Sequence, residues 1–228
     1  MINLNIKVSR IKELMLMAFY YVAYYCIQLP MWRLSYNSHG NVFDCKGKIT
    51  KCSIKLNGGG NKVVIGKDVR LHNVKISLVG NGLALYIGEG TIWMESGRIR
   101  LENDNNYIKI GKNCDFRGCF FTCSESGTGI EIGDDCLFSA NVVIRASDSH
   151  SILDAENMRI NHGKDVHIGK HVWLCNGVAV LKGCDIGDDS VLGTNCVISS
   201  KQIPSGSVVA GNPGQIVKQN ITWSKSLI

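Results

Sequence analysis

The chain has 228 residues, of which 45% are hydrophobic and 19% charged, so it can bury a core and is not a disordered segment. Twenty-five glycines beside three prolines exclude collagen-like and proline-rich chains and favour many tight turns. The net charge of +6 comes without a dense run of Lys and Arg, which fits a phosphate-bearing ligand or an acidic polymer and gives no support for nucleic-acid binding.

The N-terminal segment, residues 1–36, carries no repeat. Lys7, Arg10 and Lys12 precede an apolar run with a helix-like centre, which ends at Pro30 because proline does not continue a helix. The run has no small-residue cleavage site, and it is too short and too rich in tyrosine for a membrane span. We therefore expect a helical, apolar segment in a cytoplasmic protein.

Two roles for this segment stay open. It packs on the end of the following domain or on a neighbouring subunit, as apolar helices commonly do. Alternatively, residues 1–30 lie at the inner face of a membrane, with the basic side chains at the headgroups and the tyrosines at the boundary.

Residues 37–212 repeat with a period of six. Ile–Gly pairs recur at 65–66, 87–88, 110–111, 132–133, 168–169 and 186–187, and one aliphatic series continues as Ile168, Leu174, Val180, Ile186, Leu192 and Ile198. A period of six matches neither a helix nor a simple strand. It predicts an all-β solenoid in which three short strands and three corners form one triangular coil of about 18 residues, with coils stacked ~4.8 Å apart.

The fourth residue after each anchor of the repeat supports this prediction. These residues are Val69, Thr91, Cys114, Cys136, Val142, Val172, Val178, Cys184, Ser190 and Cys196. All are small or β-branched, as expected for side chains that fit inside a narrow turn. Four of the ten cysteines are therefore predicted to be buried apolar groups rather than metal ligands or disulfides.

The spacing of the Ile–Gly pairs locates the irregular parts. Successive pairs lie 22, 23, 22, 36 and 18 residues apart, so the early coils are expected to carry bulges of four or five residues at a corner. The long interval predicts an inserted loop over residues 145–167 that protrudes from the solenoid, and such loops commonly carry function. Residues 213–228 are expected to form a C-terminal cap.

Three motifs connect the repeat to a known family. SDSHSI at residues 147–152, HVWL at 171–174 and AGNP at 210–213 occur in that order. Over about residues 60–223 the chain resembles the hexapeptide-repeat acyltransferases, and most closely the bacterial O-acetyltransferases that modify capsule and O-antigen polysaccharides. The resemblance implies a left-handed parallel β-helix, a homotrimer, and acetyl-CoA bound in the groove between adjacent subunits without a metal.

The resemblance also implies a catalytic group. His150 matches the family's catalytic histidine, and a histidine, with an ordinary pKa of ~6.5, suits removal of a proton from a sugar hydroxyl. Asp148 is the candidate that orients this imidazole, with Asp154 or a backbone carbonyl as alternatives. Trp173 matches the tryptophan that lines the active-site groove.

Several residues match positions that the family places along acetyl-CoA. Small residues let the pantetheine arm approach backbone amides, and a basic residue usually lies near the nucleotide. The candidates for the pantetheine are Asn176, Gly177, Ala179, Gly193 and Thr194, and those for the nucleotide are Lys201 and Lys218.

The sequence departs from the family pattern at two places. Cys175 stands where glycine or alanine is usual, which narrows the groove or exposes a thiol. Gly214 and Gln215 replace the common Ala–Lys pair, which removes one candidate phosphate contact.

These residues predict an O-acetyltransferase that acts on a surface polysaccharide or its precursor. One alternative is N-acetylation of an amino sugar or of a small xenobiotic. The other is a metal-binding structural or anhydrase-like solenoid, because the spacing of His162, His167 and His171 suggests ligands. That reading is weaker, since a zinc site needs three well-placed histidines facing one cleft and the loop supplies only His150 clearly.

Overall fold

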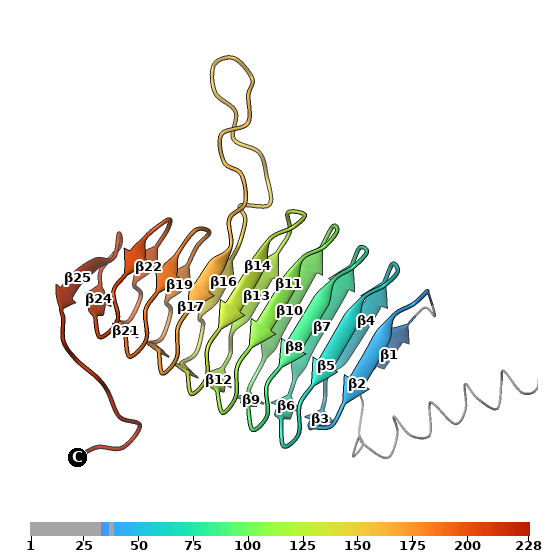
Figure 1. The fold of residues 1–228 in the computed structure, drawn as a ribbon, viewed down its shortest axis with the longest axis horizontal. Coiled ribbons are helices and arrows are strands. Elements are labelled where there is room, and N and C mark those ends of the chain that lie inside the picture. Colours follow the sequence, from blue (N-terminus) through green and yellow to red (C-terminus); the bar gives the residue numbers. More distant parts are fainter. Residues whose placement is uncertain (1–32, 37–38) are drawn as a thin grey trace, which may run out of the picture.

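The computed structural model describes residues 33–36 and 39–228, in which the chain winds as a triangular β-solenoid (Figure 1). The strands follow one another around three sheets, so each coil contributes one strand to each sheet. The predicted solenoid of hexapeptide coils is confirmed. The helix expected near the N-terminus falls on residues 1–32, outside the described part.

Every neighbouring pair of strands is parallel except the last pair of sheet C. Sheet A contains β1 (Arg33–Tyr36), β4 (Ser53–Asn57), β7 (Val74–Val79), β10 (Gly97–Glu102), β13 (Phe120–Cys123), β16 (Val143–Arg145), β19 (Ala179–Val180) and β22 (Val197–Ile198). Sheet B contains β2 (Val42–Cys45), β5 (Lys62–Ile65), β8 (Ala84–Ile87), β11 (Tyr107–Ile110), β14 (Gly129–Ile132), β17 (Val166–Ile168), β20 (Asp185–Ile186) and β23 (Gln202–Ile203). Sheet C contains β3 (Lys48–Thr50), β6 (Arg70–His72), β9 (Ile92–Met94), β12 (Asp115–Arg117), β15 (Leu137–Phe138), β18 (Trp173–Leu174), β21 (Val191–Leu192), β24 (Val208–Ala210) and β25 (Gln215–Lys218).

Strand β1 places the start of the solenoid earlier than the sequence predicts. Its four residues belong to the segment expected to be helical, yet they pair in parallel with β4. Within the part of the chain that the structure describes, the first residue in a strand is therefore Arg33 rather than a residue after 36. Among the described residues, no helix has the length and apolar character needed to cross a membrane.

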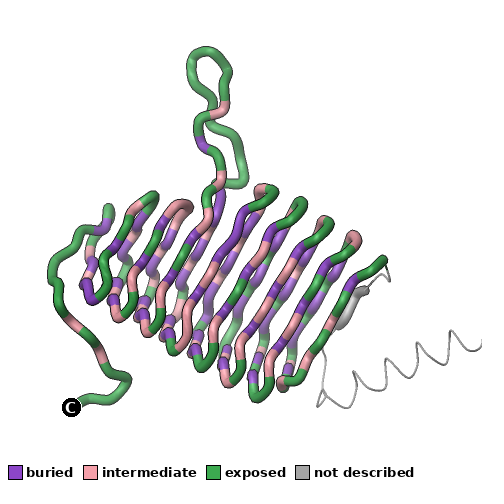
Figure 2. Tube along the Cα trace, in the orientation of Figure 1, coloured by how far each residue is buried: buried purple, intermediate pink, exposed green. Residues whose placement is uncertain are grey.

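The six predicted Ile anchors stack directly on one another in sheet B. Five register pairs join them in succession, across intervals of 18 to 36 residues, and all six are buried. The ten predicted inner residues are also buried, the four cysteines included, and the nine cysteines of the described part are free thiols. The apolar core therefore runs along the axis of the prism (Figure 2).

The glycine after each anchor lets the coils approach at the corner between sheets B and C. A Cβ added to Gly88 would lie 2.4 Å from the carbonyl oxygen of Gly111, and one added to Gly111 would lie 2.5 Å from the carbonyl carbon of Gly133. Because these neighbours are backbone atoms, they cannot move aside. Glycine therefore recurs at this position because the distance between stacked coils leaves no room for a side chain.

The early coils are wider than the late ones. Register partners are 20 to 23 residues apart before the loop, as in Val42 and Lys62, and 17 or 18 apart after it, as in Val191 and Val208. The additional residues lengthen the strands that flank the corner between sheets A and B: β7 and β10 have six residues, whereas β19 and β22 have two. The expected corner bulges are therefore longer strands, because alternating residues such as Leu78 find places in the core.

The C-terminal cap covers the open end of the core. Strand β25 turns back antiparallel to β24, and Gly214 at its start is buried against Cys196 and Ile198. A Cβ on Gly214 would lie 2.6 Å from the Sγ atom of Cys196. The departure from the family pattern at this position therefore has a packing cause.

Candidate active site

The inserted loop rises from the corner between sheets A and B (Figure 1). Its irregular part covers residues 146–165, because β16 ends at Arg145 and β17 begins at Val166. It leaves the solenoid where wide coils give way to narrow ones, and most of it is exposed (Figure 2). The loop therefore lies at the point where the coils of the prism become narrower.

The last wide coil braces the base of the loop from one side. The Glu125 carboxylate accepts hydrogen bonds from the Arg159 guanidinium and, at 3.0 Å, from the Gly163 N–H. Although burial would raise the pKa of Glu125, these hydrogen bonds lower it. The hydroxyl of Ser124 lies 2.8 Å from those of Ser147 and Ser149, at the neck of the loop.

The first narrow coil holds the loop from the other side. The ammonium of Lys182 donates hydrogen bonds to the Asp148 carboxylate and, at 2.8 Å, to the carbonyl oxygen of Asn161. Lys182 and the Asn161 side-chain amide together lower the pKa of Asp148. Asp148 is therefore an anionic anchor of the loop.

Asn161 closes the loop around His150. Its side-chain N–H groups donate to the carbonyl oxygen of His150 and to the Asp148 carboxylate, both at 2.8 Å, while its side-chain oxygen accepts from the N–H of Ile152 at 2.7 Å. Asn161 is 8% exposed, whereas His150 is exposed. The backbone of His150 is thus fixed and its side chain faces outward.

Neither predicted carboxylate bonds to the imidazole of His150 within the described chain. The Asp148 carboxylate accepts hydrogen bonds from Lys182 and Asn161, so it acts on His150 only by holding the loop. Asp154 accepts hydrogen bonds from the N–H groups of Glu156 and Met158 and thereby caps the tight turn at the tip. The orienting role of Asp148 stays a prediction.

Trp173 lies on sheet C beside the C-terminal segment. Its ring centroid is 5.7 Å from that of Trp223, which stacks on the ring of His171 at 4.2 Å and donates a hydrogen bond to the His171 carbonyl oxygen. The indole N–H of Trp173 is buried and has no hydrogen-bond partner in the described part of the chain. Trp173 therefore holds an unused donor next to a stacked aromatic pair.

The residues predicted for the pantetheine gather in two adjacent coils. Asn176 and Gly177 form the corner that joins β18 to β19, and Gly193 and Thr194 form the same corner one coil later. Ala179 begins β19, and Trp173 begins β18. The two corners touch, since a hydrogen bond joins the Asn195 N–H to the Asn176 carbonyl oxygen at 2.9 Å.

The two lysines predicted for the nucleotide lie elsewhere. The ammonium of Lys201 donates hydrogen bonds to the Gly214 carbonyl oxygen and, at 3.1 Å, to the side-chain oxygen of Gln215, so it holds the start of the cap. Lys218 is exposed at the end of β25. Neither lysine forms a hydrogen bond or ion pair with the described corner that carries the pantetheine candidates.

One chain does not bring the two parts of the predicted site together. His150 lies on the loop at the corner between sheets A and B, whereas Trp173 lies on sheet C. In the described residues no hydrogen bond or ring contact joins them.

Comparisons with known proteins define the family. The family model described as "Bacterial transferase hexapeptide (six repeats)" matches residues 165–200, and "Hexapeptide repeat of succinyl-transferase" matches residues 118–146. The polysialic acid O-acetyltransferase of Neisseria meningitidis is 36% identical over 171 residues, 75% of this chain and 78% of that protein. The chain belongs to the hexapeptide-repeat O-acetyltransferase family.

Two solved structures extend this similarity to the fold. The polysialic acid O-acetyltransferase OatWY aligns with a TM-score of 0.79 and 31% identity, over 87% of this chain and 93% of that chain. The polySia specific acetyltransferase NeuO aligns with a TM-score of 0.72 and 29% identity, over 86% and 89%. The solenoid fold of this O-acetyltransferase is therefore shared with both solved structures.

The three histidines suggested as metal ligands lie apart in this O-acetyltransferase. His162 is 3.8 Å from Glu125, His167 is 3.8 Å from Glu131, and the His171 Nδ1 atom is 2.7 Å from the Asp189 carboxylate. In residues 39–228 no three His, Cys, Asp or Glu side chains group as metal ligands do. Each histidine instead has its own acidic neighbour.

Sequence reasoning missed Asn161, Lys182 and Glu125, which position the loop. Their partners lie 9 to 38 residues away along the chain, and none of the three belongs to a recognisable motif. The signal available was weak: an asparagine among exposed residues in a loop that had to be held at its base.

Proposed function

We propose that this O-acetyltransferase transfers the acetyl group of acetyl-CoA to a hydroxyl of a bacterial surface polysaccharide, and that the acceptor is an acidic polymer of the polysialic acid kind. The observation that carries this proposal is the exposed imidazole of His150 on a loop braced from both sides. The similarity to two polysialic acid O-acetyltransferases supports the choice of acceptor.

The chemistry needs one base. The His150 imidazole accepts the proton of the acceptor hydroxyl while the hydroxyl oxygen attacks the thioester carbonyl carbon. The tetrahedral intermediate then expels the CoA thiolate, which takes the proton from the imidazolium. Products are the acetyl ester and free CoA, and His150 returns to its starting form.

Positioning by the loop contributes to this step. Because Asn161 fixes the backbone of His150, the imidazole needs to settle only its own side-chain torsions when the substrates bind. The indole N–H of Trp173, which has no partner in the described chain, is the donor that we assign to the groove holding the thioester or the acceptor.

The active site is completed between copies of the chain, which we propose form a homotrimer. The separation of His150 from Trp173 within one chain supports this assembly. The exposed apolar side chains of Ile152, Leu153 and Met158 on the loop support it further, since a partner surface would cover them. The trimer operates in the cytoplasm, with residues 1–30 at the inner face of the membrane, where surface polysaccharides are assembled.

Calorimetry of the full chain with acetyl-CoA, beside a matched zinc titration, tests the proposal. We expect micromolar binding of acetyl-CoA, about −8 kcal/mol, and CoA release that requires polysialic acid. His150→Ala should keep the affinity for acetyl-CoA and lose turnover. Zinc binding without acetyl-CoA binding would overturn the proposal and favour the metal-binding solenoid.

A further inference from the structure

Positive charge is concentrated in the first coils of the solenoid. Residues 39–86, which we name the basic coils, contain eight Lys and Arg and two Asp and Glu, whereas residues 87–228 contain 13 and 16. The overall charge of +6 therefore conceals a strong difference between the two ends. A long anionic ligand would be drawn to one end of the prism.

The cations of the basic coils have no acidic partners in the described chain. All eight cations are exposed, and none forms an ion pair with a described carboxylate. They are Lys46, Lys48, Lys51, Lys55, Lys62, Lys67, Arg70 and Lys75. Further along, Lys109 pairs with Glu131 at 2.8 Å and Lys170 with Asp134 at 3.3 Å. In the basic coils none of the eight cations has an ion pair with a described residue, whereas seven of the 13 cations in residues 87–228 form one.

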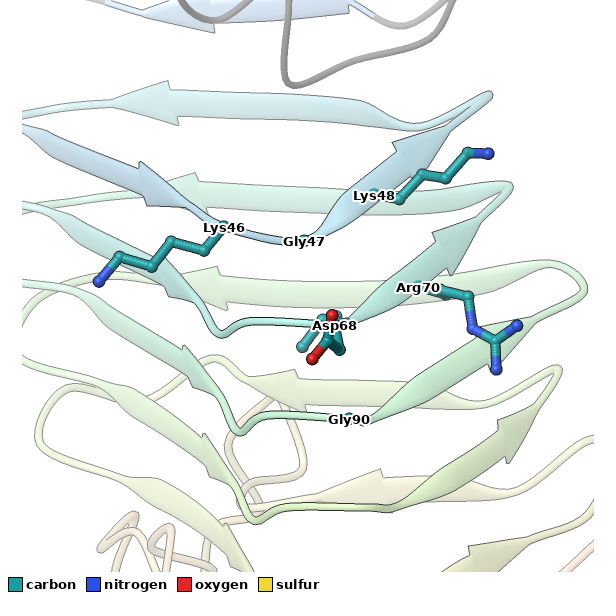
Figure 3. A pocket seen from close by; sticks show the side chains of 7 residues that line it. Lys46, Gly47, Lys48, Asp68, Arg70 and Gly90 are labelled. Atoms are coloured by element: carbon teal, nitrogen blue, oxygen red, sulfur yellow. The ribbon is translucent and has the colours of Figure 1, made fainter.

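A hollow of about 650 Å³ lies within the basic coils, at the corner between sheets B and C (Figure 3). Lys46 lies on one side of the corner, and Lys48 and Arg70 lie on the other, with Gly47 between them. Lys48 and Arg70 are register partners on β3 and β6, so they repeat along the prism axis at ~4.8 Å. A second hollow on this corner is lined by Lys109 together with its ion-pair partner Glu131.

The residues that line the first hollow favour binding of a sugar acid over binding of a nucleic-acid phosphate backbone. Asp68 lies among the cations, and a carboxylate there accepts hydrogen bonds from sugar hydroxyls while the cations bind sugar carboxylates. The lining residues include no aromatic ring, which single-stranded nucleic acids use as a platform for their bases.

We propose that the basic coils, through Lys46, Lys48 and Arg70, bind the carboxylate-bearing sugars of an extended acidic polysaccharide while another part of the same polymer lies at the catalytic loop. This inference rests on the proposed function. In sheet C, five strand spacings separate β3 from β18, which is ~24 Å along the axis. Only an acceptor of several sugars spans that distance, so the enzyme should favour long chains.

Two triple variants of the full chain separate this site from general charge effects. The first is Lys46→Gln, Lys48→Gln and Arg70→Gln. The second, a matched control, is Lys109→Gln, Lys112→Gln and Arg117→Gln, whose cations are exposed but already paired with Glu131, Glu89 and Asp115. Acetyl transfer is measured at saturating acetyl-CoA with long polysialic acid and with a sialic acid trimer, at low and high salt.

At low salt, we expect the first variant to raise the KM for long polysialic acid about tenfold, with kcat retained, because three attractive charges are lost. At high salt the difference from wild type should become smaller, since salt screens charge attraction. The KM for the trimer should not change, and the control should match wild type with both acceptors. An unchanged KM for the long polymer would overturn the inference while leaving the acetyltransferase activity in place.

Two further outcomes are decisive. If wild type acetylates neither acceptor, the proposed function fails, and the inference fails with it. If single-stranded DNA of equal charge displaces polysialic acid from wild type as well as polysialic acid itself does, the assignment of these coils to a polysaccharide is overturned.

Discussion

The side-chain amide of Asn161 donates a hydrogen bond to the backbone carbonyl of His150 over 2.8 Å. The same amide group also donates to Asp148, so one buried side chain joins the ascending and descending arms of the loop next to His150. We expect Asn161→Ala to lower kcat about tenfold with little change in the affinity for acetyl-CoA, because a misplaced base costs rate rather than binding. Asn161→Asp, which keeps the shape but loses the donors, should behave similarly. Unchanged kcat in both would exclude a positioning role.

Replacing His150 by Ala should lower turnover by about 10²–10⁴-fold, the usual contribution of a general base. The natural control is His162→Ala, since His162 is also an exposed loop histidine but lies beside Glu125. CoA release measured with a thiol reagent reports both. Turnover of His150→Ala within a few-fold of wild type would remove this residue as the base.

The anchoring of the loop should depend on pH in acid. Lys182 and Asn161 lower the pKa of Asp148 in the folded chain, so the stabilising contact is fully present above the unfolded value of ~3.9 and disappears as pH falls through the lower folded value. Hydrogen exchange of residues 148–161, expressed relative to the intrinsic rate at each pH, should therefore be constant from about pH 7 to 5 and rise below about pH 4. In Lys182→Met that rise should begin at higher pH. Identical profiles for the two proteins would contradict this account.

Stacking distance at the corner of sheets B and C can be tested with alanine. Gly111→Ala places a methyl group 2.5 Å from the backbone of Gly133, and we expect it to cost roughly 1–3 kcal/mol, or a Tm lower by about 3–10 °C. Gly193→Ala is the matched control, since its Cβ would meet the carbonyl oxygen of Val209 at an ordinary 3.5 Å. Equal Tm values for the two variants would show that the coils can separate at this corner.

The aromatic contact of the C-terminal segment should secure that segment. Trp223→Ala removes the stack on His171 and the hydrogen bond to its carbonyl oxygen, at a cost of about 1–2 kcal/mol because the ring is only half-buried. Trp223→Phe keeps the ring and should lose less. Limited proteolysis after Lys218 is the measurement, and equal cleavage of wild type and Trp223→Ala would show that the contact does not hold the segment.

The repeat was predictable because each coil must bury the same positions. Ile65, Ile87, Ile110 and their successors mark the coils by their place in a six-residue pattern, and this survives even the 36 residues between Ile132 and Ile168. The longer strands of the wide coils escaped prediction, since a strand of six and a strand of two with a bulge show the same sequence spacing.

The candidate site was predictable only where a motif marks it. His150 and Trp173 belong to motifs, but the hydrogen bond of Lys201 to the Gly214 carbonyl depends on how the cap folds back, which no local pattern contains. The loop shows the same limit. Its internal contacts, such as Asn161 with Ile152, join residues of a segment without periodicity.

The loop at the corner of sheets A and B can be exchanged without disturbing the solenoid. Strands β14 and β17 keep their register although residues 146–165 intervene, and neighbouring coils keep theirs with far fewer residues at the same corner. Length at this corner is therefore decoupled from the integrity of the core. The loop can therefore be exchanged for one of another length while the stack of coils beneath it stays as it is.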